Sequence, residues 1–445
     1  MDPFFVKAIQ FILSLSLLII LHEFGHFIPA RIFKIKVEKF FLFFDIKFAL
    51  FKKKIGDTVY GIGWLPLGGY CKMAGMIDES MDTEAMGEEP KPWEFRSKPA
   101  WQRLIVMLGG VTVNVFVALV IYSCIIGFYG EPFTSKEDLK NGFAVSPLME
   151  KYGFQQGDKI VDVNGEPFKD QLMIRQYLMV RDVQNIRVEH ENGDIENLQL
   201  PDDIGMQLFK SGEMPGLTFD RIPVKIDSMA ADGAAEKAGI KITDKIKSVN
   251  GHPFNYRSDV SYALQKKRAN EATVIVERDG RSLEKKLNIG DDQKLGIYFR
   301  PINEDYGIER QNEKYSLGTS ISKGISYGYW KLHDYVAQFK YIFTAKGATQ
   351  VGGFGAIAGL FPDTWNWLTF WETTAFISIA LAFMNILPIP ALDGGHVTFL
   401  LYEMITGRTP SDKFLEYAQI IGFFLILALV LFANGNDVYR WITGN

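Results

Sequence analysis

Four long apolar runs alternate with charged stretches along the 445-residue chain. They cover residues 8–21, 104–129, 368–392 and 419–433. With its flanks, each run is long enough to form a helix that crosses a bilayer, and the second run contains no charged residue. The pattern predicts four transmembrane helices, with both chain ends on one side. We interpret the first run as a helix and not as a signal peptide, because it continues into HEFGHFIPARIF without a cleavage site.

Basic residues near the ends of these runs indicate the orientation. One side carries Arg31, Lys34, Lys36, Lys39, Arg96, Lys98, Arg103, Arg408 and Lys413. The other side carries Lys7, Lys136, Lys140, Lys346 and Arg440. Because cytoplasmic loops are enriched in lysine and arginine, we expect the first side to be cytoplasmic and residues 131–367 to face outward.

Residues 57–73, DTVYGIGWLPLGGYCKM, combine strand-forming side chains with four glycines. They favour a small β-sheet lying against the membrane on its cytoplasmic side, although a plain glycine-containing turn would fit as well. A glycine-rich edge strand lets another backbone approach closely. An extended peptide could therefore pair with it as an additional strand.

The outward-facing part contains a repeat. Residues 153–168 and 239–254 align at an offset of 86, with nine of sixteen positions identical. The first copy contains the pattern G-D-x-I-x-x-V-N-G, and the second copy has the same pattern without the first glycine. This pattern resembles the PDZ domain, and two copies predict tandem domains. PDZ domains bind extended peptides by strand addition, but these two could equally serve to exclude bulky partners. Neither copy shows an obvious G-L-G-F-like loop.

Beyond the repeat, apolar residues recur at steps of three and four through residues 317–343. This spacing predicts a helix with one apolar face, and its position beside a membrane span favours a helix lying on the outward-facing membrane surface. The alternative is a helix packed on the core of a soluble domain.

Overall composition narrows the classes further. The net charge of −4 suggests no nucleic-acid partner. Two cysteines, Cys71 and Cys124, exclude a disulfide scaffold and a paired-cysteine metal or redox site.

The end of the first run reads His22-Glu23-Phe24-Gly25-His26, which is an HExxH motif. On a helix, residues four apart lie on one face, so both imidazoles can hold one Zn²⁺. Glu23 lies beside that face and can accept a proton from a zinc-activated water. Ionisable groups at the end of a membrane span are costly and are functional by default, which weakens the alternative of two buried structural histidines.

A catalytic zinc needs a third protein ligand and an open position. The third run ends in a segment where Pro388 and Pro390 break the helix, followed by Asp393-Gly-Gly-His396. We predict Asp393 as the third ligand. His396 could replace Asp393 or orient it, and Cys71 and Cys124 are further possibilities.

Two asparagines lie within the runs. Asn385 could hydrogen-bond to substrate backbone or to a developing oxyanion, or it could link two helices. For Asn114, which follows Gly109 and Gly110 in the second run, we predict a role in close packing between helices.

Together these residues resemble the site-2 protease family of intramembrane zinc metalloproteases. The resemblance rests on HEFGH, PLGGY, a Gly-Gly-x-x-x-Asn second run, and N-x-x-P-x-P-x-L-D-G-G-H in the third. Four spans with two external PDZ-like domains are similar to its Gram-negative, RseP-type branch, which regulates the sigma-E response. One departure is Gly-Gly in the second run, where the family more often has Gly-Pro.

The resemblance implies cleavage of transmembrane helices that an upstream site-1-type protease has already trimmed. Expected partners are an anti-sigma factor of envelope stress signalling, remnant signal peptides and membrane lipid. His22, His26 and Asp393 would bind Zn²⁺, and Glu23 would be the catalytic base. Asn385, Gly68 and Gly69 would hold the unwound substrate, and the PDZ pair would act as a size filter. The location would be the bacterial inner membrane, with the PDZ domains periplasmic and the active site toward the cytoplasm.

The expected fold is a four-helix membrane core with a small membrane-associated β-sheet and two extracytoplasmic PDZ-like α/β domains. Its predicted segments are 1–30 (first helix), 31–100 (sheet region), 101–130 (second helix), 131–215 and 216–303 (PDZ-like domains), 304–350 (interfacial helices), 351–392 (glycine-rich segment and third helix) and 393–445 (loop and fourth helix). Two alternative functions are a membrane metal-ion transporter and an inactive PDZ adaptor. The transporter lacks support because no inverted repeat is present, and an adaptor has no use for Glu23.

Overall fold

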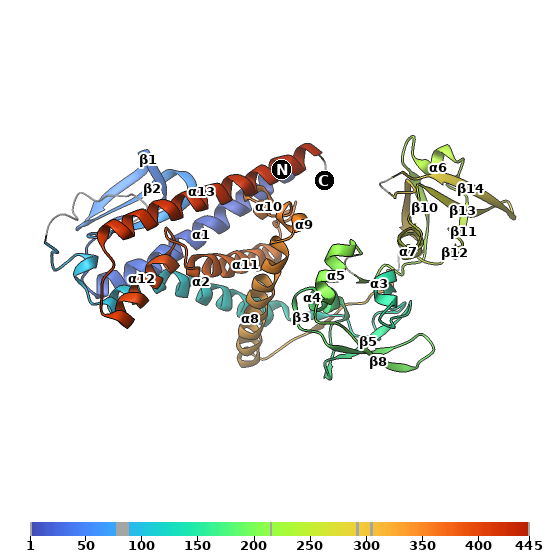
Figure 1. Cartoon of the computed structure of the whole chain (residues 1–445), viewed down its shortest axis with the longest axis horizontal. Coiled ribbons are helices and arrows are strands. Elements are labelled where there is room, and N and C mark those ends of the chain that lie inside the picture. Colours follow the sequence, from blue (N-terminus) through green and yellow to red (C-terminus); the bar gives the residue numbers. More distant parts are fainter. Residues whose placement is uncertain (1, 77–88, 214–215, 291–292, 303–305, 444–445) are drawn as a thin grey trace. The chain divides into compact units, whose positions relative to one another are not determined.

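A computed structural model describes residues 2–76, 89–213, 216–290, 293–302 and 306–443. The chain forms two compact units, one made of residues 1–130 and 314–445 and the other of residues 131–313 (Figure 1). The predicted domain boundaries at residues 215 and 303 fall on positions outside the described residues, so they stay predictions.

Among its described residues, the first unit contains four helices that are long and apolar enough to cross a membrane. They are α1 (Pro3–Ile32), α2 (Ala100–Tyr129), α11 (Trp367–Ile386) and α13 (Asp412–Thr443). Each coincides with one of the four predicted runs. At 1.5 Å per residue, even the 20-residue α11 is about 30 Å long, which matches the hydrocarbon thickness of a bilayer.

Small and hydroxylic side chains let these helices pack closely. Gly25 of α1 faces Gly109 of α2 so tightly that a Cβ on Gly109 would lie 1.9 Å from the Gly25 carbonyl oxygen. Ser378 of α11 donates a 2.7 Å hydrogen bond to the backbone oxygen of Asn114 on α2, and Thr374 donates one of 2.9 Å to Ser14 on α1. Such contacts replace the hydrophobic driving force that is missing between helices in lipid.

Helix α8 (Leu317–Ile342) packs on α2 through its glycines, with Leu332 also against the apolar cluster of α2 and α11. A Cβ on Gly324 would lie 2.3 Å from Ser123 Oγ, and one on Gly328 would lie 2.6 Å from Leu119. The predicted apolar face is largely exposed, with Leu317, Ile321, Ile325, Tyr329, Val336 and Phe343 all on the surface of the unit. The alternative of a helix whose apolar face covers a soluble core is therefore wrong.

The predicted sheet is a long hairpin of β1 (Val37–Ile55) and β2 (Thr58–Met73) that folds on itself. Residues 39–42 of β1 pair on one side with residues 69–72 and on the other with residues 59–62, and residues 49–55 pair with residues 58–63. Its register shifts repeatedly, and Phe43 and Lys47 have positive φ angles. A Cβ on Gly61 would lie 2.3 Å from the Phe41 ring, so this glycine admits an aromatic side chain against the strand. Shorter elements of the unit are η2 (Phe95–Ser97), α9 (Ala345–Ala348), α10 (Phe354–Ala358) and α12 (Asp393–Thr406).

The second unit consists of two copies of one topology. The first copy has a sheet in the order β6-β5-β7-β8, and the second has β12-β11-β13-β14. The first copy comprises β4 (Ala144–Val145), α3 (Pro147–Glu150), β5 (Lys159–Val163), β6 (Glu166–Pro167), η3 (Gln171–Met173), α4 (Ile174–Val180), β7 (Asn185–Glu189), β8 (Ile195–Gln199), α5 (Ile204–Ser211) and β9 (Leu217–Thr218). The second comprises β10 (Val224–Met229), α6 (Ala234–Lys237), β11 (Lys245–Val249), β12 (His252–Pro253), α7 (Ser258–Lys266), β13 (Glu271–Arg278), β14 (Arg281–Asn288) and β15 (Ile297–Pro301). Strands β3 (Glu131–Phe133) and β16 (Gln311–Glu313) pair where the chain enters and leaves the unit.

Each copy has its own apolar core, built from the alternating residues of its sheet and one face of its helices. Ile160, Ile186 and Val188 are central in the first core, and Ile246, Val274 and Val276 in the second. The repeat found in the sequence therefore corresponds to two separately packed bodies. Their identity as PDZ domains stays a prediction.

Candidate active site

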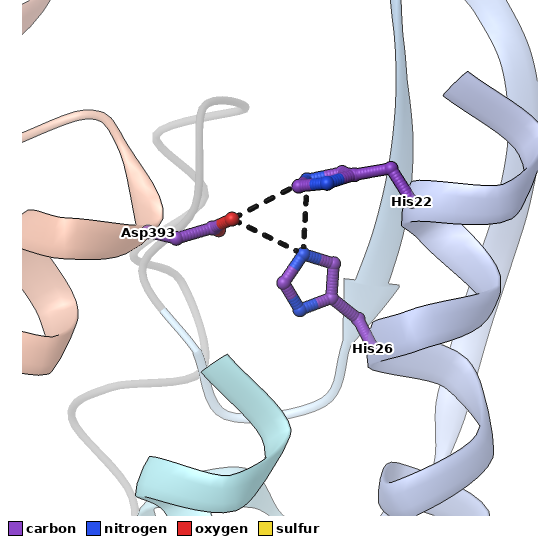
Figure 2. Close-up of side chains that lie close together, drawn as sticks. All are labelled: His22, His26 and Asp393. Carbon is purple, nitrogen blue, oxygen red and sulfur yellow. Dashed lines mark hydrogen bonds and ion pairs between the residues drawn. The ribbon is translucent and has the colours of Figure 1, made fainter. Parts of the chain in front are cut away.

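Two imidazoles on α1 and one carboxylate from α12 meet at a buried point of the first unit (Figure 2). His22 and His26 lie one helical turn apart, and their Nε2 atoms are 3.2 Å from each other. Asp393 Oδ2 is 3.3 Å from each of these two nitrogens. The structure thus brings together the three residues that the sequence predicted as ligands.

Asp393 reaches this point because the chain folds back sharply after α11. Leu387 ends the helix in an extended conformation before Pro388, and Ala391 has a φ of 78°. The next residues have no room for side chains, since a Cβ on Gly394 would lie 2.1 Å from the Leu387 backbone oxygen. The Pro-rich segment and the glycines after Asp393 therefore serve one purpose, which is to place the carboxylate at the first residue of α12.

The spacing of these three atoms fits a zinc ion. Ligands arranged tetrahedrally at about 2.0–2.1 Å from zinc lie about 3.3 Å from one another, and the observed separations are 3.2, 3.3 and 3.3 Å. Asp393 Oδ2 is buried and has no hydrogen-bond donor among the described residues. A buried carboxylate oxygen needs a compensating partner, and a cation held between the imidazoles would supply it.

The remaining candidates contribute no ligand atom to this group within the described part of the chain. His396 lies one turn further along α12, Cys71 is half-buried on β2, and Cys124 is exposed on α2. Three protein ligands leave the fourth tetrahedral position open, as catalytic zinc sites require.

Glu23 directly follows His22 in the sequence. Its side chain is buried on α1, beside the hairpin. A Cβ on Gly69 of β2 would lie 3.5 Å from Glu23 Cγ, 2.5 Å from Ile19 and 2.8 Å from the Phe41 backbone oxygen. Gly69 thus allows β2 to run directly alongside the glutamate. Gly68 faces the other way, toward the Phe44 ring.

Both imidazoles are oriented by partners on α2. His26 Nδ1 lies 2.8 Å from the Val106 backbone oxygen, to which it donates, and this leaves Nε2 free to bind a metal. His22 Nδ1 lies 3.2 Å from the side-chain amide of Asn114. The sequence suggested only close packing for Asn114 and missed this contact.

The sequence predicts a packing role for Gly110 too, and the structure gives this residue a second role. A Cβ on Gly110 would lie 2.3 Å from His26 Nε2 and 2.6 Å from His22 Cε1. The signal that could have revealed both roles is the spacing of Gly110 and Asn114, which lie four residues apart and so face α1 together.

Asn385, near the end of α11, places its side-chain nitrogen 3.3 Å from His22 Nε2. It therefore lies at the edge of the ligand cluster and within reach of a group bound there. The same contact joins α11 to α1, so the alternative of a link between two helices also fits, and the substrate-binding role of Asn385 stays a prediction.

A buried His-His-Asp cluster on membrane-length helices, with a glutamate next to the first histidine, defines an intramembrane zinc metallopeptidase. Comparison with known proteins agrees, since residues 10–429 match the model of Peptidase family M50. The chain belongs to this family, which makes it a zinc metalloprotease of the site-2 type and not a metal-ion transporter or an inactive adaptor.

Two relatives span almost the same length. A "Regulator of sigma E protease" of Haemophilus influenzae is 28% identical over 454 residues, covering 97% of this chain and 98% of its own. A "Putative zinc metalloprotease" of Vibrio cholerae is 28% identical over 458 residues, with the same coverage.

Proposed function

We propose that the protein cuts protein substrates within their membrane-spanning segments. The observation that carries this proposal is the location of the ligand cluster, which lies at buried and half-buried positions on helices that include one long and apolar enough to cross a bilayer. A substrate must reach this point as an extended chain, because the carbonyl groups of a helix are hydrogen-bonded and shielded from attack.

The roles of the residues follow from their positions. His22, His26 and Asp393 hold the ion, and bound Zn²⁺ polarises the scissile carbonyl and activates a water molecule. Glu23 accepts the proton of the attacking water and passes it to the leaving amide nitrogen. Asn385 lies 3.3 Å from His22 Nε2 and donates to the substrate or to the oxyanion.

Strand β2 holds the substrate in extended form. Its residue Gly69 lies next to Glu23, whereas Gly68 faces the other way, toward the Phe44 ring. A substrate segment that pairs with β2 would present its carbonyl groups toward the ligand cluster.

In this proposal the protein is a protease in the inner membrane of a Gram-negative bacterium. The distribution of basic residues supports an active site toward the cytoplasm and a periplasmic second unit. The relative named as a regulator of sigma E supports an anti-sigma factor as substrate, trimmed beforehand by a site-1-type protease, and remnant signal peptides are a second class. The tandem repeat would then exclude substrates that still carry large external domains.

The central test is cleavage of a model transmembrane peptide in detergent micelles by wild-type protein and by Glu23→Gln. The variant should keep one zinc per chain and lose cleavage by at least about 100-fold. A chelator should abolish wild-type cleavage. Full activity of the variant would remove Glu23 from its role, and absence of any product from the wild type would reject the proposed substrate class.

Orientation is tested separately by cysteine labelling in intact cells. Single cysteines introduced within residues 60–70 should react only after the inner membrane is breached, whereas those within residues 160–260 should react from the periplasm. The opposite pattern would reject the proposed topology.

A further inference from the structure

Helix α12 carries Asp393 at its first residue, so the position of this helix determines where the carboxylate lies. The start of α12 is attached to residues 387–392, which form no helix or strand. Cβ atoms on Gly394 and Gly395 would lie 2.1 Å from the Leu387 backbone oxygen and 2.7 Å from the Ile389 backbone oxygen. These contacts define the turn before α12, but they do not relate α12 to the helix that orients the imidazoles.

That helix is α2. The backbone oxygen of Val106 lies 2.8 Å from His26 Nδ1, and the side-chain nitrogen of Asn114 lies 3.2 Å from His22 Nδ1. Both histidines therefore have their orienting partners on α2, whereas the third ligand comes from α12. The three ligand atoms meet only if α12 occupies one particular position along α2.

Apolar contacts bring α12 against α2 but do not define this position. Val397 and Leu400 of α12 belong to the same core cluster as Val106 and Met107 of α2. Contacts between apolar side chains are non-directional. They favour close packing of the two helices, and they select one register only weakly.

A directional contact joins the two helices near the other end of α12. An ion pair links the guanidinium of Arg103, in the first turn of α2, to the carboxylate of Glu403. Arg103 Nε also donates a 2.9 Å hydrogen bond to the Lys98 backbone oxygen, just before α2. The guanidinium is thus held from two sides, and its planar shape restricts the direction from which the carboxylate approaches.

The ion pair is largely buried, since the side chains of Arg103 and Glu403 are 13% and 15% exposed. Removing two charges from water offsets most of their attraction, and apolar side chains of similar volume often stabilise such a contact at least as well. A defined geometry is what the charged pair adds. Glu403 stands ten residues after Asp393, about 15 Å along the helix axis, so the pair acts at a distance from the ligand atoms.

We propose that Arg103 and Glu403 are positioning residues of the metal site. Their ion pair fixes α12 in one register on α2 and thereby places Asp393 between the two imidazoles. Without the pair, α12 keeps its apolar contacts, but the carboxylate no longer has a single position relative to His22 and His26. The chain should stay folded and bind zinc more weakly. This inference does not rest on the proposed substrate, because it concerns only the ligands of the metal.

The experiment measures the zinc affinity of the full chain in detergent by competition with a chelator. Glu403→Gln keeps the shape of the side chain and removes its charge, and Arg103→Met removes the guanidinium. We expect each change to weaken zinc binding at least about tenfold, as is typical when a group that orients a metal ligand is lost. Wild-type zinc affinity in both variants would overturn the proposal.

A double-mutant cycle separates positioning of Asp393 from a general loss of structure. In the background of Asp393→Ala, no carboxylate remains to be placed, so Glu403→Gln should have no further effect on zinc affinity. A weaker chelator extends the measurement to this background. If Glu403→Gln weakens zinc binding equally in both backgrounds, the ion pair does not act through Asp393 and the proposal fails.

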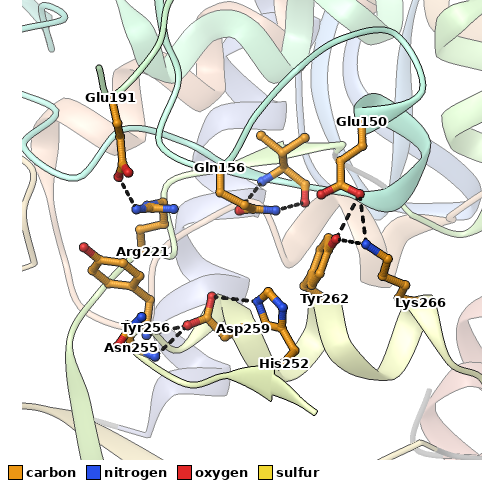
Figure 3. Close-up of polar contacts among 11 residues, drawn as sticks. Glu150, Gln156, Glu191, Arg221, His252, Asn255, Tyr256, Asp259, Tyr262 and Lys266 are labelled. Atoms are coloured by element: carbon orange, nitrogen blue, oxygen red, sulfur yellow. Dashed lines mark hydrogen bonds and ion pairs between the residues drawn. The ribbon is translucent and has the colours of Figure 1, made fainter. Parts of the chain in front are cut away.

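A second Arg–Glu pair provides the control. Arg221 of the second unit pairs with Glu191, and its guanidinium lies 4.4 Å from the centre of the Tyr256 ring (Figure 3). Glu191→Gln removes the same charge as Glu403→Gln, but from a unit that contributes no atom to the described ligand cluster. It should leave zinc affinity unchanged, and a loss equal to that of Glu403→Gln would overturn the proposal.

Thermal unfolding of the zinc-free proteins shows whether each variant is folded. If Glu403→Gln and Arg103→Met both prevent folding, Arg103→Lys decides, because lysine keeps the charge but lacks the planar fork of arginine. Weaker zinc binding by folded Arg103→Lys supports positioning, whereas wild-type affinity overturns it.

Discussion

Asn114 of α2 places its side-chain nitrogen 3.2 Å from His22 Nδ1, on the side of the imidazole opposite the ligand cluster. Metal binding through Nε2 requires the proton to be on Nδ1, so the asparagine must then present its oxygen to the ring. In the amide orientation of the structure, Asn114 Oδ1 is buried without a partner among the described residues. Rotation of the amide, which exchanges two nearly equivalent atoms, would give this oxygen a donor and fix His22 in the metal-binding tautomer.

We therefore predict that Asn114→Ala weakens zinc binding by about 10–100-fold while the protein stays folded, as is typical for loss of a group that orients a ligand. Competition with a chromogenic chelator measures the affinity. Thr112→Ala is the control, because Thr112 lies on the same helix and hydrogen-bonds only its own backbone turn. Equal zinc affinity in all three proteins would reject an orienting role for Asn114.

A second prediction separates Asp393 from His396. Asp393→Asn should weaken zinc binding by more than about 100-fold, because a neutral amide is a poorer ligand than the carboxylate whose oxygen lies 3.3 Å from both imidazole nitrogens. His396→Ala should leave zinc content near one per chain, since His396 contributes no atom to the ligand group. Metal analysis after dialysis distinguishes the two. Loss of zinc from the His396 variant alone would overturn the assignment.

The cluster of His22, His26 and Asp393 could be predicted from the sequence because its chemistry depends on local spacing. HExxH places two imidazoles on one helical face, and the Pro-Pro break followed by Asp393 marks an acid at an unusual turn. The partner role of Asn114 could not be predicted in the same way, because it depends on which helix surfaces face each other after folding. Helix α5 does carry local signals, with Asp203 at its start, Lys210 in its last turn and Gly212 in a left-handed conformation at its end, but no helix was predicted from them. Strand β1 was also not predicted from the sequence. Its irregular register breaks the alternation of apolar and polar side chains that indicates a strand.

The hairpin provides a third prediction. A side chain at position 69 would collide with Ile19 and with the Phe41 backbone, whereas one at position 68 meets only the ring of Phe44, which can move. Gly69→Val should therefore displace β2 from α1 and lower the cleavage rate at least about tenfold, with zinc content unchanged. Gly68→Ala should lower it less. Cleavage of the model transmembrane peptide and metal analysis measure both effects, and a fully active Gly69→Val protein would show that β2 need not lie beside Glu23.

Equivalent aspartates of the two repeats have different partners. Asp244 of the second copy accepts hydrogen bonds of 2.6 and 2.7 Å from Arg278, which hold the pKa of its carboxyl below the usual value. Asp158, 86 positions earlier, instead lies 2.7 Å from His190 Nδ1, and Glu196 lies 3.0 Å from Nε2. Burial alone would lower the pKa of His190, but these two carboxylates outweigh it and raise that pKa above 6.5. Burial also raises the pKa of Asp158, whose protonation weakens the pair at acid pH.

This difference predicts that only the first repeat loosens as pH rises. A histidine whose folded pKa lies above its unfolded value of about 6.5 contributes stability that is complete below 6.5 and is lost as pH rises through the folded pKa. Arg278 keeps its charge throughout this window. Hydrogen exchange of the β7 amides, corrected for intrinsic rate, should therefore accelerate between pH 6 and pH 8.5, whereas that of β13 should not. His190→Arg, which copies the second repeat, should remove the acceleration. If β7 and β13 respond alike, or if the arginine variant keeps the wild-type profile, the Asp158–His190 pair is not the cause.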